Sequence, residues 1–360
     1  MSNYISGSSS KIGAIKETTF NTTPSETKTA LRMTSESLQA TYNKLDEGVL
    51  MAAKTQVAQD LGSVSVSGDV DTVLNPSFAD WLMETGLGVK TVNSSAVQPG
   101  SGATLEEVVY TLADVNADIP SSSLELWRGT EGFTYSGMTI SQLSLEATAQ
   151  DFVKANISFN GTKETKYTGA STIGAASTIG SYKCTKAKLL PNTAGSDDIE
   201  EWLTFSWDSC PTGQVYDVQT TTLTLDNGLE QTPATYCSGL YNNRPSHGQR
   251  SVTISCNVPY STGFETFRQT YYANENAPNL ALMLVFASKE TVTFVPAGAS
   301  ASVTEPAHQM FVILPNVSIN NTSANASGQG IIDGSYSGIA LSIGSTEPIK
   351  VVRRTYTATN

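Results

Sequence analysis

The sequence predicts a mainly β protein, and two observations lead to this class. Only 15 % of the 360 residues are charged and 39 % are hydrophobic, while Ser, Thr, Asn and Gly are plentiful; an ordinary globular domain has about a quarter charged residues. Several segments also alternate apolar and polar residues, which is the period of a half-buried strand. A chain of this length can bury enough surface to fold as one large or two ordinary domains without disulfides or metal.

Residues 1–45 are predicted to form an extended, polar N-terminal arm, followed by a β-domain over residues 46–360. The arm has two short strand-like pieces, Ile12–Thr19 and Thr29–Ser37, separated by the turn sequence NTTP. It contains too little apolar surface for a core of its own. We therefore expect it to lie on the body of the same chain or on a neighbouring copy.

The first clear strand starts at Val64, and a short helix follows it. On one side of this strand fall Val64, Val66, Val70 and Leu74, and on the other side Ser65, Ser67, Asp69 and Asp71. The sequence NPSFADWLMETGLG then predicts a helix that is capped by Ser77 and ended by Gly86. Phe78, Trp81 and Leu82 have the spacing of its buried side.

The remaining segments predict further strands, and one pattern occurs twice. TLEEVVYTLADV favours a strand, with a helix as the alternative. The repeated pattern, a strand, a polar turn and a returning alternating strand, covers Ile140–Gly161 and Thr221–Pro259. These segments predict an internal duplication of β-hairpins, with a possible sub-boundary in the Gly/Ser/Thr-rich loop at 161–182. GFETFRQTYYANEN predicts a second helix, and LALMLVFAS, ETVTFVP and HQMFVILPNVSI predict strands.

The charge of the chain excludes one class of partner. The formal net charge is −12 and the pI is near 4.7, whereas proteins that hold nucleic acid neutralise its phosphates with Lys and Arg. There is no apolar run of about 18 residues, and the first residues lack the basic and apolar regions of a secretory signal. We expect synthesis in a cytosol and neither DNA binding nor a membrane.

No motif for a metal, a cofactor or nucleophilic catalysis is visible. The four cysteines lie far apart and there are only two histidines, His247 and His308, so neither a zinc site nor a Ser-His-Asp arrangement is indicated. No phosphate-binding loop occurs. Cys256 lies on the apolar face of a strand and is expected to be a buried, inert thiol.

Asp69 and Asp71 are the one pair of carboxylates that could serve as a catalytic acid and base. Two residues apart on one strand face, their side chains lie about 6.5–7 Å apart, at the edge of the range for an inverting glycosidase. A sugar cleft also needs outward-facing aromatic residues, but Phe78 and Trp81 have the spacing of a buried helix side. We therefore expect no enzyme and interpret Ser65, Ser67, Asp69 and Asp71 as a polar, acidic face.

Three stretches in fixed order resemble the tail tube (major tail) proteins of long, non-contractile-tailed bacteriophages. The matching residues are Glu17, Thr19, Phe20, Thr22, Thr23 and Pro24, then Arg32, Thr34, Glu36, Ser37 and Leu38, and then Gly62, Gly68, Phe78, Trp81, Leu82, Glu84 and Leu87. Asn21 departs from the glycine usual in that family. The segments LELWRGTEGFTYSGMTISQLSLEA, TTLTLDN and FVILPNVSI resemble the later strands of the family.

The resemblance implies a β-sandwich or β-barrel subunit, with one or two short flanking helices, that joins copies of itself into rings. Such rings are usually six-fold and stack into the tube through which the genome is ejected. We expect six chains a ring, with three internally duplicated chains as the alternative. Further expected partners are the tape measure protein and the tail terminator or tip proteins.

Two surfaces are candidate sites for this role. The first is the polar face at Ser65, Ser67, Asp69 and Asp71, which would line the channel or meet the next ring, and which DNA would pass without binding. The second is the arm at Glu17, Thr19, Phe20, Pro24, Arg32 and Glu36, expected to order only against the neighbouring ring. A β-sandwich adhesin or carbohydrate-binding virion protein is the alternative function.

Overall fold

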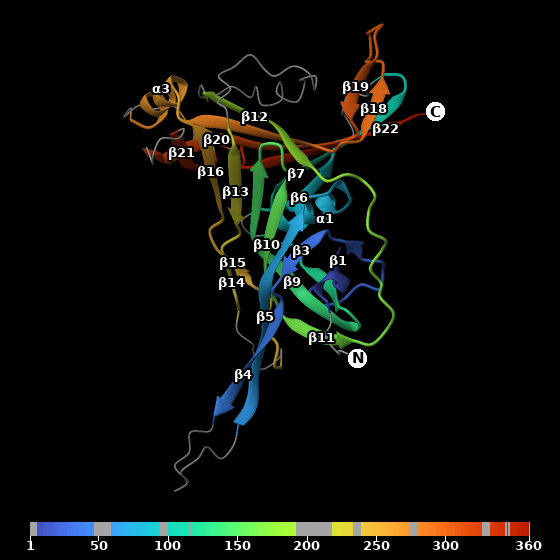
Figure 1. Ribbon diagram of the computed structural model, residues 1–360. Helices are drawn as coiled ribbons and strands as arrows, with labels where there is room; N and C mark the ends of the chain where they lie inside the picture. The colour runs from blue at the N-terminus through green and yellow to red at the C-terminus, as the bar shows by residue number, and fades with distance from the viewer. Residues whose placement is uncertain are drawn as a thin grey trace.

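The fold is a two-layered arrangement of antiparallel strands with two short helices (Figure 1). The structure is a computed structural model that describes residues 6–46, 59–93, 100–114, 117–191, 218–232, 239–273, 279–325, 332–342, 344 and 346–359. The first part of the chain forms η1 (Gly7–Ser9), β1 (Lys11–Lys16), β2 (Thr29–Ala30), β3 (Met33–Glu36), β4 (Gln39–Asp46), β5 (Gln59–Val73), α1 (Pro76–Leu87), β6 (Gly88–Val92), β7 (Ala103–Leu112), β8 (Ser122–Arg128), β9 (Glu131–Thr148), β10 (Lys154–Gly161) and β11 (Lys163–Tyr167). The second part forms β12 (Lys183–Pro191), β13 (Thr220–Asp226), β14 (Leu229–Glu230), β15 (Ser246–His247), β16 (Ser251–Pro259), α3 (Thr262–Tyr271), β17 (Leu280–Ala287), β18 (Thr291–Phe294), β19 (Val303–Pro306), β20 (His308–Asn325), β21 (Asp333–Ala340) and β22 (Lys350–Ala358).

One long antiparallel sheet runs through the whole chain. Its strands follow one another in the order β4–β5–β10–β9–β13–β16–β21–β20. The second layer consists of β1, β8 and β11 beside the start of β9, and of β12, β17, β22 and β7 beside the start of β20. The predicted mainly β class with two short helices is confirmed, and the arrangement is that of a β-sandwich.

The apolar core lies between the layers because buried residues alternate with more exposed ones along β10, β13, β16, β21 and the second half of β5. On β5, Val64, Val66 and Val70 are buried, whereas Ser67 and Asp69 are exposed. β16 alternates in the same way, and Cys256 on its apolar side is 1 % exposed; burial raises the pKa of this thiol. Fully burying an aliphatic side chain contributes about 1.5–3 kcal/mol, so the pattern fixes which face of each strand is inside.

The two helices are where the sequence predicts them, but the ends of α1 differ. The N-cap is Asn75 rather than Ser77, since Asn75 Oδ1 accepts from Ser77 N at 2.9 Å and Pro76 occupies the first turn. Gly86 does not end the helix; Gly88 does, at φ 109°. A capping residue is recognised by its backbone conformation, which the sequence pattern alone does not reveal.

Gly68 marks the tightest approach between β5 and the segment before it. Its φ is +146°, and an added Cβ would lie 2.5 Å from the carbonyl oxygen of Ser37. We expect Gly68→Ala to lower the free energy of unfolding by about 2 kcal/mol. The positive φ is unfavourable for alanine, and the added Cβ would clash with the backbone of Ser37.

Urea denaturation of the purified protein measures this loss. Gly263→Ala is the matched control, since Gly263 lies in α3 and its nearest neighbour, Ser261 Oγ, is 3.5 Å from the added Cβ. An equal loss in both variants would contradict the steric explanation.

Candidate assembly surfaces

The outer side of the long sheet is a mainly polar face that crosses both halves of the chain, and Ile339 on β21, 37 % exposed and opposite Thr253, is an apolar exception. Strand pairing extends the predicted face of β5 sideways onto β10, β9, β13, β16 and β21 in turn. Its uncharged residues beyond β5 are Asn156, Ser158 and Asn160 on β10, Gln142 and Ser144 on β9, Thr222 and Thr224 on β13, Thr253 and Ser255 on β16, and Ser335 and Ser337 on β21.

Charged groups on this surface are mostly carboxylates. They belong to Asp69, Asp71, Glu146, Asp226 and Asp333, and Lys154 adds one ammonium group at the end of β10. We call this whole surface the polar face. It is rich in hydroxyls and amides and is net acidic.

Asp69 and Asp71 lie on the polar face, and a pocket of about 220 Å³ beside Asp71 has no aromatic residue in its lining. Both carboxylate oxygens of Asp71 accept hydrogen bonds within the sheet, Oδ1 from Asn156 Nδ2 at 2.6 Å and Oδ2 from Ser35 Oγ. Phe78 is fully buried, and Trp81 is buried with its Nε1 donating to Ser122 Oγ at 3.0 Å. Neither aromatic side chain is therefore available to stack on a sugar beside this pair.

The N-terminal arm is part of the fold of its own chain. β1 pairs with β8 over Lys11–Lys16, and β3 and β4 pair with β5. The expectation that the segment orders only against a neighbouring ring therefore differs from the structure. The reason is that Ile12 and Ala14 are buried in the shared core, so the arm adds its few apolar residues to the core of the body instead of forming its own.

Glu17 connects the arm to two strands of the body. Its buried carboxylate accepts from Ser121 Oγ at 2.7 Å, Ser123 Oγ at 2.6 Å, and the backbone N–H groups of Asn21 at 2.8 Å and Gly137 at 2.9 Å. Asn21 has φ 60°, a conformation that Gly and Asn tolerate best, so asparagine suits this turn.

Replacing Glu17 by alanine is expected to lower the free energy of unfolding by about 3 kcal/mol, because buried donors lose a charged acceptor. Thermal or urea denaturation measures this loss. Glu26→Ala is the control, because Glu26 is exposed. A Glu17→Ala protein as stable as the control would show that the carboxylate is not needed to hold the arm.

The other predicted arm residues also make contacts inside the subunit. Arg32 donates to Ser181 Oγ at 2.8 Å and to the carbonyl oxygens of Ser177 and Ile179. The carboxylate of Glu36 accepts from both Nε and Nη2 of Arg128 at 2.9 Å, and this hydrogen bonding raises the pKa of Arg128. Phe20 lies under the guanidinium of Arg244, 5.5 Å from the ring centroid.

Thr19 is exposed and Pro24 is half-buried. Thr19 is the one exposed residue of the predicted arm set, since Phe20, Arg32 and Glu36 are half-buried as well. A role of the arm between rings stays a prediction.

A projecting hairpin, formed by β4 and β5, is a feature that the sequence did not predict as a site (Figure 1). Tyr42 is 52 % exposed, Leu45 61 % and Leu61 36 %. Fully burying a large apolar side chain would contribute about 1.5–3 kcal/mol to stability. Exposed apolar residues clustered on one element indicate a contact surface. In the sequence, this hairpin could have been recognised as a contact surface only from the apolar residues of TYNKLD and QDLG. These two segments flank residues 47–58, which lie outside the described ranges.

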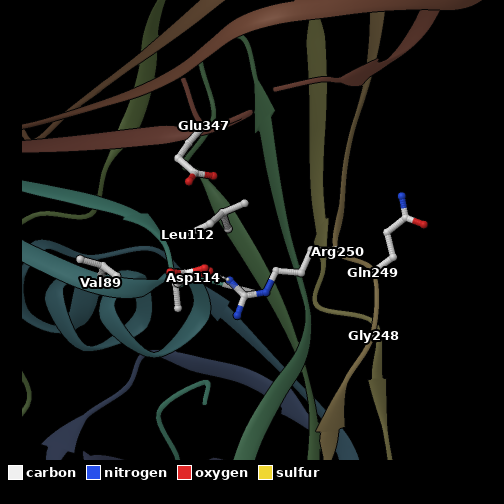
Figure 2. Close-up of a pocket in the computed structure, with 8 residues that line it drawn as sticks. Val89, Leu112, Asp114, Gly248, Gln249, Arg250 and Glu347 are labelled. Carbon is white, nitrogen blue, oxygen red and sulfur yellow. Dashed lines mark hydrogen bonds between the residues drawn. The ribbon is translucent and has the colours of Figure 1, made fainter. Parts of the chain in front are cut away.

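A cavity of about 930 Å³ lies between the two halves of the chain and is lined by Val89, Leu112, Ala113, Asp114, Gly248, Gln249, Arg250 and Glu347 (Figure 2). The guanidinium of Arg250, the residue before β16, donates to the carbonyl oxygens of Leu87 at 3.3 Å and Ala113 at 3.2 Å, which connects it to the last residue of α1. No histidine, cysteine, serine or threonine is among these lining residues. Its charged lining groups are the carboxylates of Asp114 and Glu347 and the guanidinium of Arg250.

The described residues contain no cluster typical of a metal site. No group of three or more His, Cys, Asp or Glu among them could hold a metal ion. His308 begins β20, where burial and then the positive charge of Arg353 lower its pKa. In the described part of the chain, no helix has the length and apolar character needed to cross a membrane.

The fold is thus a sandwich with one mainly polar sheet face and a projecting hairpin that exposes apolar side chains. Comparison with protein families gives the class of protein. The family model described as phage tail tube protein matches residues 7–340, so the chain belongs to the phage tail tube protein family. A search of curated proteins finds no match. Family membership makes the chain a structural component of the virion tail.

Proposed function

We propose that this chain is the subunit that assembles into stacked rings to form the phage tail tube, with the polar face lining the channel for genome ejection. The observation that carries the proposal is the polar face itself, which continues without an apolar interruption across β5, β10, β9, β13 and β16. Its carboxylates repel phosphate and offer no counterion release, so DNA can pass without being held.

The proposal includes the partners and the place of synthesis. Copies of this chain are the main partner, the tape measure protein occupies the channel before ejection, and terminator or tip proteins close the two ends of the tube. The subunit is made in the host cytoplasm and becomes part of the virion. It performs no catalysis and needs no cofactor.

Negative-stain electron microscopy of the purified protein tests this function. We expect rings or hollow tubes whose length increases with protein concentration. A particle that stays a monomer or a small closed oligomer across salt and protein concentrations would contradict the tube and favour the adhesin alternative. A glycan-hydrolysis assay of Asp69→Asn against the parent chain addresses the enzyme alternative, and we expect no activity in either protein.

A further inference from the structure

The two halves of the chain repeat the same topology. In the long sheet, β4–β5–β10–β9 is followed by β13–β16–β21–β20. The second strand of each set runs into a helix, β5 into α1 and β16 into α3. The last strand of each set, β9 or β20, continues into the other layer, where β8 and β11 flank β9 and β17 and β22 flank β20.

The registers allow the two halves to be matched residue by residue. Val73 pairs with Lys154, which pairs with Glu146, whereas Pro259 pairs with Asp333, which pairs with Asn325. These two rows of paired residues are equivalent. Asp69 and Ser255 both lie four residues before them, so Asp69 corresponds to Ser255, and β4 together with the end of β3 corresponds to β13. The two hairpins that the sequence pairs as copies are therefore not equivalent, since Ile140–Gly161 corresponds to β20–β21.

Within the chain, the two repeats meet where β13 adds to the edge of β9. Thr224 lies opposite Ser144, with 3.3 Å between their hydroxyl oxygens, and Leu225 lies opposite Leu143. At this junction β13, which corresponds to β4, pairs with β9, which corresponds to β20. The junction therefore shows that the first strand of one repeat can pair with the last strand of another.

Among the described residues, the corresponding edges of β4 and β20 are unpaired. No described strand pairs with the edge of β4 that faces away from β5. β17 pairs with one edge of β20 as far as Val317, and no described strand continues along that edge after Val317. Ser37 N donates to Asp69 O at 2.9 Å. Backbone groups that point toward and away from the partner strand alternate in an antiparallel pair, so those of Gln39 and Thr41 also point toward β5 and those of Ala40 point away from it. Thr322 Oγ1, on β20, is buried without a hydrogen-bond partner in the described structure.

We propose that each chain contributes two tube repeats to the ring, and that the free edge of β4 pairs with β20 of a second copy in the register of the β9–β13 junction. Gln39 then lies opposite Ser323 of the next copy, as Thr224 lies opposite Ser144, and Ala40 lies opposite Thr322. This inference rests on the proposed function. A ring of six repeats consequently contains three chains instead of the six chains that we expected from the sequence.

Cysteine cross-linking tests the register and the number of chains together. In the double variant Gln39→Cys with Ser323→Cys, the two Cα atoms of neighbouring copies lie about 4.5 Å apart, because the pair is not backbone hydrogen-bonded, and this distance suits a disulfide. Gln39 lies opposite Ser67 and Ser323 opposite Ser335, on the same side of the sheet as the polar face, so the substitutions leave the core intact. After mild oxidation of assembled rings, we expect a non-reducing gel ladder that ends at three chains.

The matched controls are the parent chain with its four native cysteines and the mismatched pair Gln39→Cys with Ser255→Cys, because Ser255 lies on a strand that is paired on both sides. A ladder that ends at six chains would overturn the two-repeat count. Rings that form without cross-links in the matched pair would overturn the register. If the parent chain forms no rings, the proposed function fails, and this inference fails with it.

Discussion

Replacing Ala40 by proline is expected to weaken ring formation while leaving the subunit folded. The ladder directs the N–H of Ala40 toward the free edge, so proline removes a donor that the isolated subunit does not use. In the ring, the loss leaves a carbonyl of the next copy unpaired, which costs about 1–3 kcal/mol at each junction. Since every 1.4 kcal/mol is a factor of ten, the concentration needed for assembly rises about five- to hundredfold.

Sedimentation velocity measures the assembled fraction, and urea denaturation measures the stability of the subunit. Thr41→Pro is the matched control, because the N–H of Thr41 points toward β5 and its loss weakens the hairpin itself. Normal assembly of Ala40→Pro would show that copies do not join through the edge of β4.

Placing a lysine at equivalent positions of both repeats is expected to make the tube retain DNA. Asp69 and Ser255 are both exposed on the polar face. Asp69→Lys with Ser255→Lys raises the charge of each chain by three, from −12 to −9, and puts the added cations on one surface. Binding then falls steeply with salt, at least about tenfold between 50 and 200 mM, because each neutralised phosphate releases counterions.

Co-sedimentation of a short double-stranded DNA with assembled tubes measures this retention, and we expect no retention by the parent tube. Gln269→Lys on the exposed side of α3 is the control for a lysine elsewhere on the surface. DNA held by Gln269→Lys tubes but not by the polar-face variant would place the DNA-facing surface near α3.

The sequence predicted the elements with a strong alternating or helical pattern. β5, β7 and β16 lie where the pattern placed them, and the polar side of β5 faces outward. These predictions succeed because the apolar residues of one strand must share a face whatever that face packs against.

The features that depend on partners far along the chain could not be predicted in the same way. Glu17 and Arg32 looked available for a neighbouring ring, yet their contacts come from Ser121, Gly137 and Ser177, more than 100 positions away. The repeat was visible only as similar hairpins, and these were matched incorrectly, because equivalence is set by strand order and register. Asn75 was missed as a cap because Ser77 is an equally good capping residue by type.

The hairpin of β18 and β19 distinguishes the two repeats on the outside of the fold (Figure 1). In the first repeat β8 and β9 are joined directly through Gly129 and Thr130, whereas in the second this hairpin lies between β17 and β20. If the repeats alternate around the ring, the channel wall has nearly six-fold regularity while the hairpin occurs three times. A peptide inserted beside Gly298, where an added Cβ meets no atom within 4 Å, would therefore label every second position and make the threefold order of the tube visible.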